Sequence, residues 1–211
     1  MKRRRPDLRG AERGVAAIEF ALFLPFLLFL MFVITDFARG MQANMVLINL
    51  SRESANLAAR SKLQLTDNSQ AIMRAVAESA PPLDMNKSGM IYITKLMGYK
   101  DSSGAIVTVV LEQYRWDDSV NTMGFRVSGY APVSRLWTCL NWNSTTGACN
   151  NIPTLANAPR ISLMSGSLFE GEIIYAAETF YRFNVLFGDV ALGGSLTVPN
   201  FGTNLYSMTV F

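Results

Sequence analysis

An isolated carboxylate lies inside the most apolar stretch of this 211-residue chain. Glu19 is the only charged residue between Gly14 and Asp36. A charged side chain at membrane depth costs about 3 kcal/mol, so such residues normally have a partner and a function. If the chain began at Val15, its α-amine, or that of a neighbouring subunit in an assembly, could pair with Glu19, because residues four apart share a helix face. The alternative is a glutamate without a role, whose carboxylate snorkels to water near the inner interface.

The two cysteines could form a disulfide or contribute to a metal site. Nine residues separate Cys139 from Cys149, and the chain has no histidine. A zinc site needs three or four cysteine or histidine ligands, so the pair is a poor zinc site. In an exported domain, two cysteines at this spacing predict a disulfide that closes a short loop. Two buried free thiols are the alternative.

The sequence contains no recognisable catalytic constellation. Without histidine it lacks the commonest general base, and residues 165–167 are in the wrong frame for a serine nucleophile elbow. The adjacent acids Asp117 and Asp118 follow a predicted strand and read as solvated turn residues rather than an acid–base pair. The glycine-rich residues 185–202 lack phosphate-binding spacing. We therefore expect a non-enzymatic protein without a cofactor or metal; a membrane-tethered hydrolase is the enzyme-class alternative.

A basic leader precedes an apolar segment long enough to cross a membrane. The basic residues of the leader are Lys2, Arg3, Arg4, Arg5, Arg9 and Arg13. At ~1.5 Å per residue, residues 15–35 span the ~30 Å hydrocarbon core. The positive-inside rule keeps the leader in the cytoplasm and exports the C-terminal part. A cleaved secretory signal is the alternative, but the run is long for such a signal and no A-x-A site closes it. The rest of the chain is nearly neutral, which argues against nucleic-acid binding.

The periodicity predicts one long helix followed by a sheet. The helix covers residues 15–61 with a kink at Pro25. Its outer half has an apolar stripe that we expect to be core or, alternatively, a subunit interface. The stripe consists of Met41, Met45, Ile48, Leu50, Leu57 and Ala58. Predicted boundaries are 1–14 for the leader, 15–35 for the transmembrane helix, 36–62 for a helical stem and 63–211 for the exported head.

The head is predicted to be an α+β domain. Residues 66–69 read as a capping loop before a short helix at 70–79, which Pro81-Pro82 ends. Strands are predicted at residues 90–97, 105–116, 124–133, 172–187 and 204–211. Turn residues at 101–104 join the first two strands in a hairpin. We expect an antiparallel sheet packed on one side by the long helix, and an irregular segment at residues 134–160.

The N-terminal residues resemble a type IV prepilin signal. A basic leader runs into Gly14, then VAAIEF and ALFLPFLLFLMF. More narrowly, residues 10–62 resemble the TadE-like family of minor pilins, or pseudopilins, of tight-adherence (Tad, or Flp) pili. The shared features are GxxxxEF, the Leu24-Pro25 pair and a helix ending near an Ala-Arg pair, here SRESANLAAR. Phe20 follows the glutamate, where the major Flp pilins and many relatives have tyrosine.

The resemblance implies a pilin-like fold and a role in assembly. A prepilin peptidase would cut between Gly14 and Val15, making Glu19 the fifth mature residue, which would neutralise an amine as pilin helices pack. The protein would lie in the bacterial inner membrane with a periplasmic head, or enter an extracellular pilus. Its partners would be the peptidase, other pilins and minor pilins, and the inner-membrane assembly platform. The alternative is an uncleaved single-pass scaffold or binding protein, and in either case residues 137–151 are a candidate partner contact.

Overall fold

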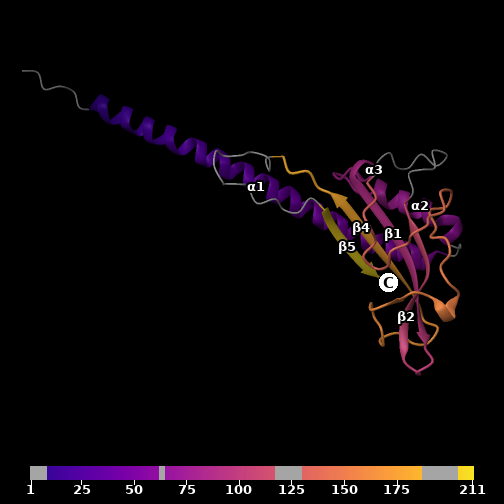
Figure 1. Cartoon of the computed structure of the whole chain (residues 1–211). Helices are drawn as coiled ribbons and strands as arrows, with labels where there is room; N and C mark the ends of the chain where they lie inside the picture. Colours follow the sequence, from indigo (N-terminus) through magenta and orange to yellow (C-terminus); the bar gives the residue numbers. More distant parts are fainter. Residues whose placement is uncertain (1–8, 62–64, 117–129, 187–203) are drawn as a thin grey trace, which may run out of the picture. The chain divides into compact units, whose positions relative to one another are not determined.

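The computed structural model describes residues 9–61, 65–116, 130–186 and 204–211, with side chains from residue 15 onward (Figure 1). These residues fall into two units. The first contains residues 9–40 and 185–186, and the second contains residues 41–184 and 204–211 where described. A long apolar N-terminal helix and an antiparallel sheet confirm the predicted α+β class.

The first unit consists mainly of the apolar part of helix α1 (Arg9–Arg60). This helix begins before Gly14 and continues through Pro25 to the second unit. Proline is tolerated in membrane helices because neighbouring groups can satisfy the freed carbonyl. The kink at Pro25 and the boundaries of leader, transmembrane segment, stem and head remain predictions.

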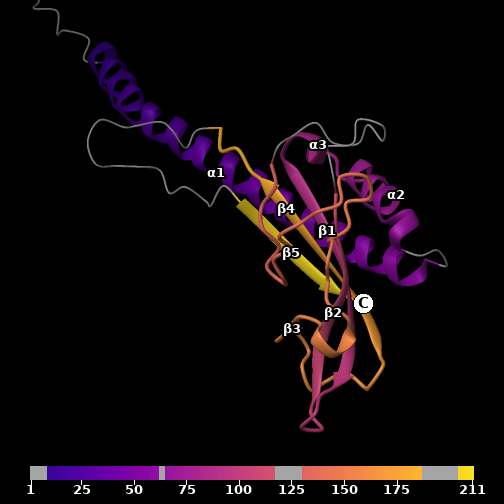
Figure 2. The same ribbon diagram turned by 45° about the vertical axis from the view of Figure 1, so that its right-hand side comes forward.

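The second unit is built on a five-stranded antiparallel sheet with the order β3-β2-β1-β4-β5. The strands are β1 (Gly89–Lys100), β2 (Ile106–Arg115), β3 (Arg160–Ile161), β4 (Ile173–Arg182) and β5 (Asn204–Val210). The short elements are α2 (Leu65–Glu78), α3 (Met85–Ser88) and the 3-10 turn η1 (Leu155–Asn157). The chain's last strand therefore forms one edge, beside β4 (Figure 2).

Helices cover one face of the sheet. The other face is covered by a long loop, of which residues 130–159 are described. On β4, the Thr179 hydroxyl donates to the Leu47 carbonyl of α1 at 3.1 Å, whereas Glu178 accepts from Ser134 of the loop. Adjacent residues of a strand point to opposite faces, so α1 and the loop lie on opposite sides of the sheet. The larger hydrophobic core includes, on the helical side, Leu47, Leu50, Ala58, Met73, Val76, Ile91, Ile93 and Trp116.

Small residues decide which stripe of α1 faces the sheet. The buried positions are Ala43, Leu47, Leu50, Ser51, Ser54, Ala55 and Ala58, which recur every three or four residues. Ser51 Oγ lies 3.0 Å from Ser207 Oγ and 2.9 Å from Thr209 Oγ1 on β5. The predicted core stripe was therefore partly wrong: Leu50 and Ala58 are buried, but Met41 and Met45 are exposed. Leu57, also predicted as core, is exposed as well.

Helix α2 begins earlier than predicted. Residues 66–69 are helical, not a capping loop, because tertiary contacts anchor the first turn. Leu65 is buried in the core, and the Gln70 amide donates to the carbonyls of Arg115 and Thr146, both at 2.8 Å. Asp67 in the first turn also suits the positive end of the helix dipole.

The strand prediction was wrong in three places. Residues 130–133 of the predicted third strand are not in a strand, and residues 124–129 lie outside the described part of the chain. Pro132 has no N–H for a ladder, and its carbonyl accepts a hydrogen bond from the Tyr92 hydroxyl instead. Conversely, β3 is a two-residue strand inside the segment predicted to be irregular. Strand β4 ends at Arg182, short of the predicted residue 187.

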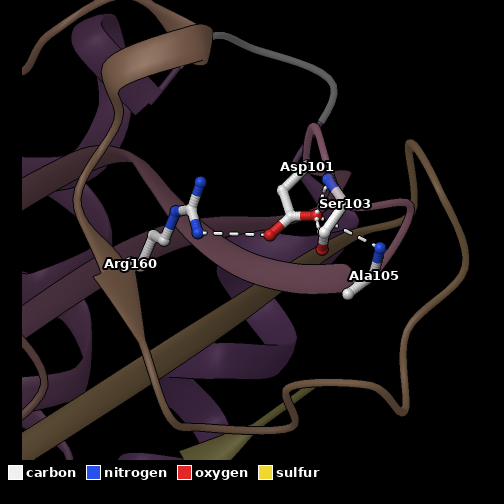
Figure 3. A network of polar contacts seen from close by, with 4 residues as sticks. All are labelled: Asp101, Ser103, Ala105 and Arg160. Atoms are coloured by element: carbon white, nitrogen blue, oxygen red, sulfur yellow. Dashed lines mark hydrogen bonds and ion pairs between the residues drawn. The ribbon is translucent and has the colours of Figure 1, made fainter.

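The predicted hairpin is confirmed, and Asp101 organises its turn (Figure 3). Its Oδ1 accepts from the backbone N–H groups of Ser103 at 2.9 Å and Ala105 at 3.2 Å, and also from the Ser103 hydroxyl. Its Oδ2 accepts from the Arg160 guanidinium of β3 at 3.3 Å. Gly104 has φ of 85°, a conformation that favours glycine. One carboxylate therefore ties the turn to the edge strand β3.

Replacement of Asp101 by asparagine is expected to lower the unfolding midpoint at neutral pH. The hydrogen bond from the Ser103 hydroxyl, together with the backbone bonds and Arg160, holds the pKa of Asp101 below its ordinary value of 3.8. A carboxylate with a lowered folded pKa stabilises the fold above its unfolded pKa, and this contribution disappears as the pH falls through the folded value. Thermal unfolding of the full chain in detergent micelles should therefore separate the two proteins at pH 7 and bring them together in acid. An equal difference between the two unfolding midpoints at pH 7 and in acid would contradict the role of the Asp101 charge.

Candidate functional site

The N-terminal part of α1 exposes apolar side chains around its whole circumference. Residues 15–28 are all exposed, and the exposed fractions of Phe20, Leu22 and Phe23 are 61%, 76% and 60%. A helix that is apolar on every side belongs in a membrane or in the core of a larger assembly. Among the described helices, α1 is the one long and apolar enough to cross a membrane, with a mean hydropathy of 2.6 over its most apolar window. This helix suggests a membrane anchor.

Glu19 is the one charged group on this surface between residues 15 and 35. Its side chain is exposed, and in the part of the chain that the structure describes no cation is paired with it. Gly14 and Val15 lie in the same helix, so Val15 and Glu19, four residues apart, share one face. The carboxylate is thus available to a cation that a cleaved terminus or another subunit would supply.

The first charge after the apolar segment is satisfied within its own unit. Asp36 is only 5% exposed, and its Oδ1 accepts from the Leu186 N–H and from the Arg39 guanidinium, both at 3.1 Å. Charge-assisted hydrogen bonds of this kind are among the stronger ones. In the sequence, Asp36 is distinguished only as the first charge after the apolar run, and that position is the signal for its role.

The cysteine pair lies in a loop fastened to β2. Cys139 and Cys149 form the predicted disulfide, with 5.9 Å between their Cα atoms. The N–H of Cys149 donates to the Gln113 carbonyl at 2.7 Å, and the N–H of Arg115 donates to the Gly147 carbonyl at 2.8 Å. Gly147 has φ of 68°, and a Cβ there would lie 2.3 Å from the Arg115 carbonyl oxygen. The loop is therefore held by the crosslink and by backbone pairing together.

Removal of the disulfide is expected to lower the free energy of unfolding by about 2–3 kcal/mol, the chain-entropy value for a loop of this length. The change is the double substitution Cys139→Ser with Cys149→Ser, measured by urea unfolding of the full chain in micelles. A reducing agent should shift the unchanged protein by a similar amount and leave the double variant where it is. Equal stability of the oxidised and double-variant proteins would contradict the prediction.

A buried glutamate joins the loop to strand β5 on the loop-covered face of the sheet. Glu178 of β4 is 0% exposed and accepts three hydrogen bonds. The donors are the Ser134 hydroxyl, the Arg135 N–H at 2.8 Å and the Tyr206 hydroxyl of β5 at 3.0 Å. A buried charge is tolerated only when it is paired or well hydrogen-bonded. Sequence reasoning missed this residue; the signal was a single acid inside the apolar strand IIYAAETFYR.

The same network continues through Ser134 to β2 and β1. The Gln113 amide, itself buried, donates to the Ser134 hydroxyl at 3.0 Å, to the Trp137 carbonyl at 3.1 Å and to Thr94 Oγ1 at 3.3 Å. Together with Glu178, these groups fix the start of the disulfide-containing loop on the sheet.

A basic, aromatic cavity lies beside this network. It has a volume of about 400 Å³ and is lined by residues that include Arg135, Trp137, Arg160, Tyr206 and Met208. The Arg135 guanidinium carbon lies 4.0 Å from the centroid of the Tyr206 ring. Burial raises the pKa of Tyr206 well above its ordinary value, and the neighbouring Glu178 charge raises it further. The phenol therefore stays neutral and keeps donating to Glu178.

The predicted site residues are divided between the two units. Gly14, Val15, Glu19 and Pro25 lie on α1, and the cysteine pair lies in the loop of the second unit. Within the described side chains, no group of three or more histidine, cysteine or acidic residues is arranged to hold a metal. The Asp117-Asp118 pair and most of the glycine-rich stretch at 185–202 lie outside the described residues.

A comparison with protein families gives one match. The model of the family described as TadE-like protein matches residues 14–56. This segment contains Gly14, Glu19 and Pro25 and continues along α1 into its sheet-facing part, and it confirms the resemblance inferred from the sequence. It points to a protein associated with Tad pili. No curated protein and no solved structure matches the chain.

Proposed function

We propose that this chain, whose residues 14–56 are a TadE-like domain, is a minor pilin or pseudopilin that takes part in assembling a tight-adherence pilus. The observation that supports this role most is the all-round apolar exposure of residues 15–28 with one carboxylate among them. A permanent membrane anchor needs the apolar surface but not the glutamate, which costs about 3 kcal/mol at membrane depth.

A prepilin peptidase of the inner membrane would cut after Gly14. The new terminus would place the α-amine of Val15 one helical turn from Glu19, in the same subunit or across a contact between subunits. An ion pair buried between helices adds little net stability, but it penalises any axial shift that separates the charges. Glu19 would therefore set the axial register in which pilin helices pack.

The second unit would be the periplasmic head, and the chain would act through binding rather than catalysis. Its disulfide suits an oxidising compartment. The partners would be the peptidase, other pilins and minor pilins, and the assembly platform in the inner membrane. The head would prime, cap or regulate the pilus while α1 stays in the membrane or packs among other pilin helices.

The first test is the intact mass and N-terminal sequence of the protein isolated from membranes of a host with an active prepilin peptidase. A chain that begins at Val15 would establish cleavage after Gly14. A chain that still begins at Met1, while a control prepilin is cleaved in the same cells, would overturn the processed-pilin proposal. The protein would then be a single-pass scaffold whose Glu19 pairs with another membrane protein.

A further inference from the structure

We infer that the free edge of β5 is a docking site for an extended segment of a partner protein that carries an acidic side chain. This inference goes beyond the proposed function and does not depend on cleavage after Gly14, since the edge belongs to the second unit of the cleaved and uncleaved chain alike. Its recognition mode is strand addition, in which backbone hydrogen bonds supply affinity and pockets for alternate side chains supply specificity.

The hydrogen-bond register shows which backbone groups face outward. Tyr175 of β4 and Phe211 exchange two hydrogen bonds, at 2.9 and 2.8 Å. In an antiparallel pair such bonded positions alternate, so Thr209 and Ser207 also face β4. The N–H and C=O groups of Tyr206, Met208 and Val210 therefore point away from it, and no described residue is hydrogen-bonded to them along that edge.

This edge lacks the features that usually prevent strand addition. Sheet edges are commonly protected by charged residues, proline, bulges or very short strands. The opposite edge, β3, has two residues, Arg160 and Ile161. By contrast, β5 has seven residues, NLYSMTV, with no charge, no proline and an unbroken register against β4. The long, uncharged edge is therefore the one suited to accept another strand.

Hollows lie on both sides of this edge, where alternate side chains of an added strand would point. On the loop side is the cavity lined by Arg135, Trp137 and Met208 described above. On the helix side is a groove of about 480 Å³ between α1 and the end of β5. Its lining residues are Asn49, Arg52, Glu53, Asn56, Thr209, Val210 and Phe211. An added strand would place one set of side chains in the cavity and the alternate set in the polar groove.

Charge identifies the chemistry of the occupant. The cavity is lined by two arginines and by no acidic residue. Arg160 is already paired with Asp101, whereas Arg135 stacks on Tyr206 and has no carboxylate partner among the described residues. The guanidinium of Arg135 would bind a carboxylate. The apolar residues that line the rest of the cavity would pack against apolar side chains on the same face of the added strand. We therefore assign the cavity to a glutamate or aspartate of the incoming segment, with small polar residues on its other face.

The test uses the full chain in detergent micelles and three labelled peptides with soluble flanks. Each peptide has the core Thr-Val-Thr-Z-Thr-Val-Thr, in which Z is Glu, Gln or Lys. Fluorescence anisotropy should show the Glu peptide binding at least about tenfold more tightly than the Lys peptide, with Gln between them. Amide hydrogen exchange should slow at Met208 and Val210 when the Glu peptide is bound. Thr209 should not respond, because its amide already faces β4.

Variants at three positions separate the edge from the cavity. Met208→Pro removes an outward N–H without touching the β4 ladder and should weaken all three peptides at least about tenfold. Met208 also lines the cavity, so Met208→Ala, which loses the same side chain but keeps the N–H, is the matched control and should weaken them less. Arg135→Gln should remove the preference for Glu over Lys, and Arg135→Glu should reverse it. Arg74→Glu, a charge reversal on α2 at a residue that lines neither hollow, should leave the affinities of the three peptides unchanged. The exchange rates at Leu205 and Thr209 report whether Met208→Pro keeps β5 paired.

Three results would overturn the inference. They are no saturable binding of the Glu peptide, binding without slower exchange at Met208 and Val210, and equal affinity for the Glu and Lys peptides. Protection of these amides that rises with protein concentration, without peptide, would instead assign the edge to a second copy of the chain. Cleavage after Gly14 is measured separately, so either proposal can fail while the other stands.

Discussion

Replacement of Glu19 by alanine is expected to leave cleavage after Gly14 intact and to reduce the protein in sheared pili at least about tenfold. In the proposed assembly the carboxylate pairs with an α-amine of Val15 between packed helices. Removal of one partner of a buried pair costs about 3–5 kcal/mol, because the other charge is left uncompensated. The measurement is immunoblotting of the membrane and sheared-pilus fractions from a host that assembles tight-adherence pili, with the N-terminus of each fraction sequenced.

Two neighbouring changes serve as controls for Glu19→Ala. Ile18→Ala removes apolar volume beside Glu19 and leaves the charge, so it should be incorporated nearly normally. Glu19→Asp keeps the carboxylate on a shorter side chain and should restore part of the incorporation. Normal incorporation of Glu19→Ala would disprove the charge-pair role. Accumulation of the uncleaved Glu19→Ala chain would show that the glutamate acts at processing instead.

Replacement of Glu178 by alanine is expected to lower the free energy of unfolding by about 3 kcal/mol or more. The change leaves the Ser134 hydroxyl, the Arg135 N–H and the Tyr206 hydroxyl without their acceptor. Each buried donor left unsatisfied costs about 1–3 kcal/mol. Urea unfolding of the full chain in micelles, followed by the fluorescence of the buried Trp116, measures the loss.

Further variants show whether the loss of stability in Glu178→Ala comes from the lost hydrogen bonds or from the lost side-chain volume. Glu178→Gln keeps the shape and one acceptor oxygen, so it should be less damaging than Glu178→Ala. Tyr206→Phe removes one donor and should cost about 1 kcal/mol. Glu170→Ala, a change at an exposed glutamate, should stay within about 0.5 kcal/mol of the unchanged protein. A loss below about 1 kcal/mol for Glu178→Ala would mean that water replaces the missing carboxylate.

Local patterns predicted the elements that short stretches of sequence specify. The apolar run after Gly14 predicted the exposed helix, because continuous hydrophobicity over about 20 residues leaves few other structures. The turn residues at 101–104 predicted the β1–β2 hairpin. The positive φ at Gly104 is a conformation that glycine adopts without steric cost, so the residue type alone indicates the turn. The cysteine spacing, together with the predicted export of the head, predicted the disulfide, which needs only two residues in an oxidising compartment.

Patterns failed where a distant contact outweighed local preference. Residues 66–69 have loop composition, yet they are helical because Leu65 and Gln70 are anchored in the second unit. Residues 130–133 have the composition of a strand, but Pro132 cannot complete a ladder and its carbonyl binds Tyr92 instead. In both segments the surrounding fold supplies the stabilising contacts, and those contacts involve residues far away in the chain.

By itself, the sequence determined the apolar helix, the place of Glu19 four residues after Val15, the class of the fold and the absence of histidine chemistry. These properties depend on composition and short spacing alone. Only the tertiary structure decided that Met41 and Met45 face outward and that Glu178 is buried with three donors. It also decided that no other described strand pairs with the outer edge of β5, which lies between two hollows. Each of these depends on which segments meet in space, because the small residues of α1 and the order of the strands select the faces that are covered.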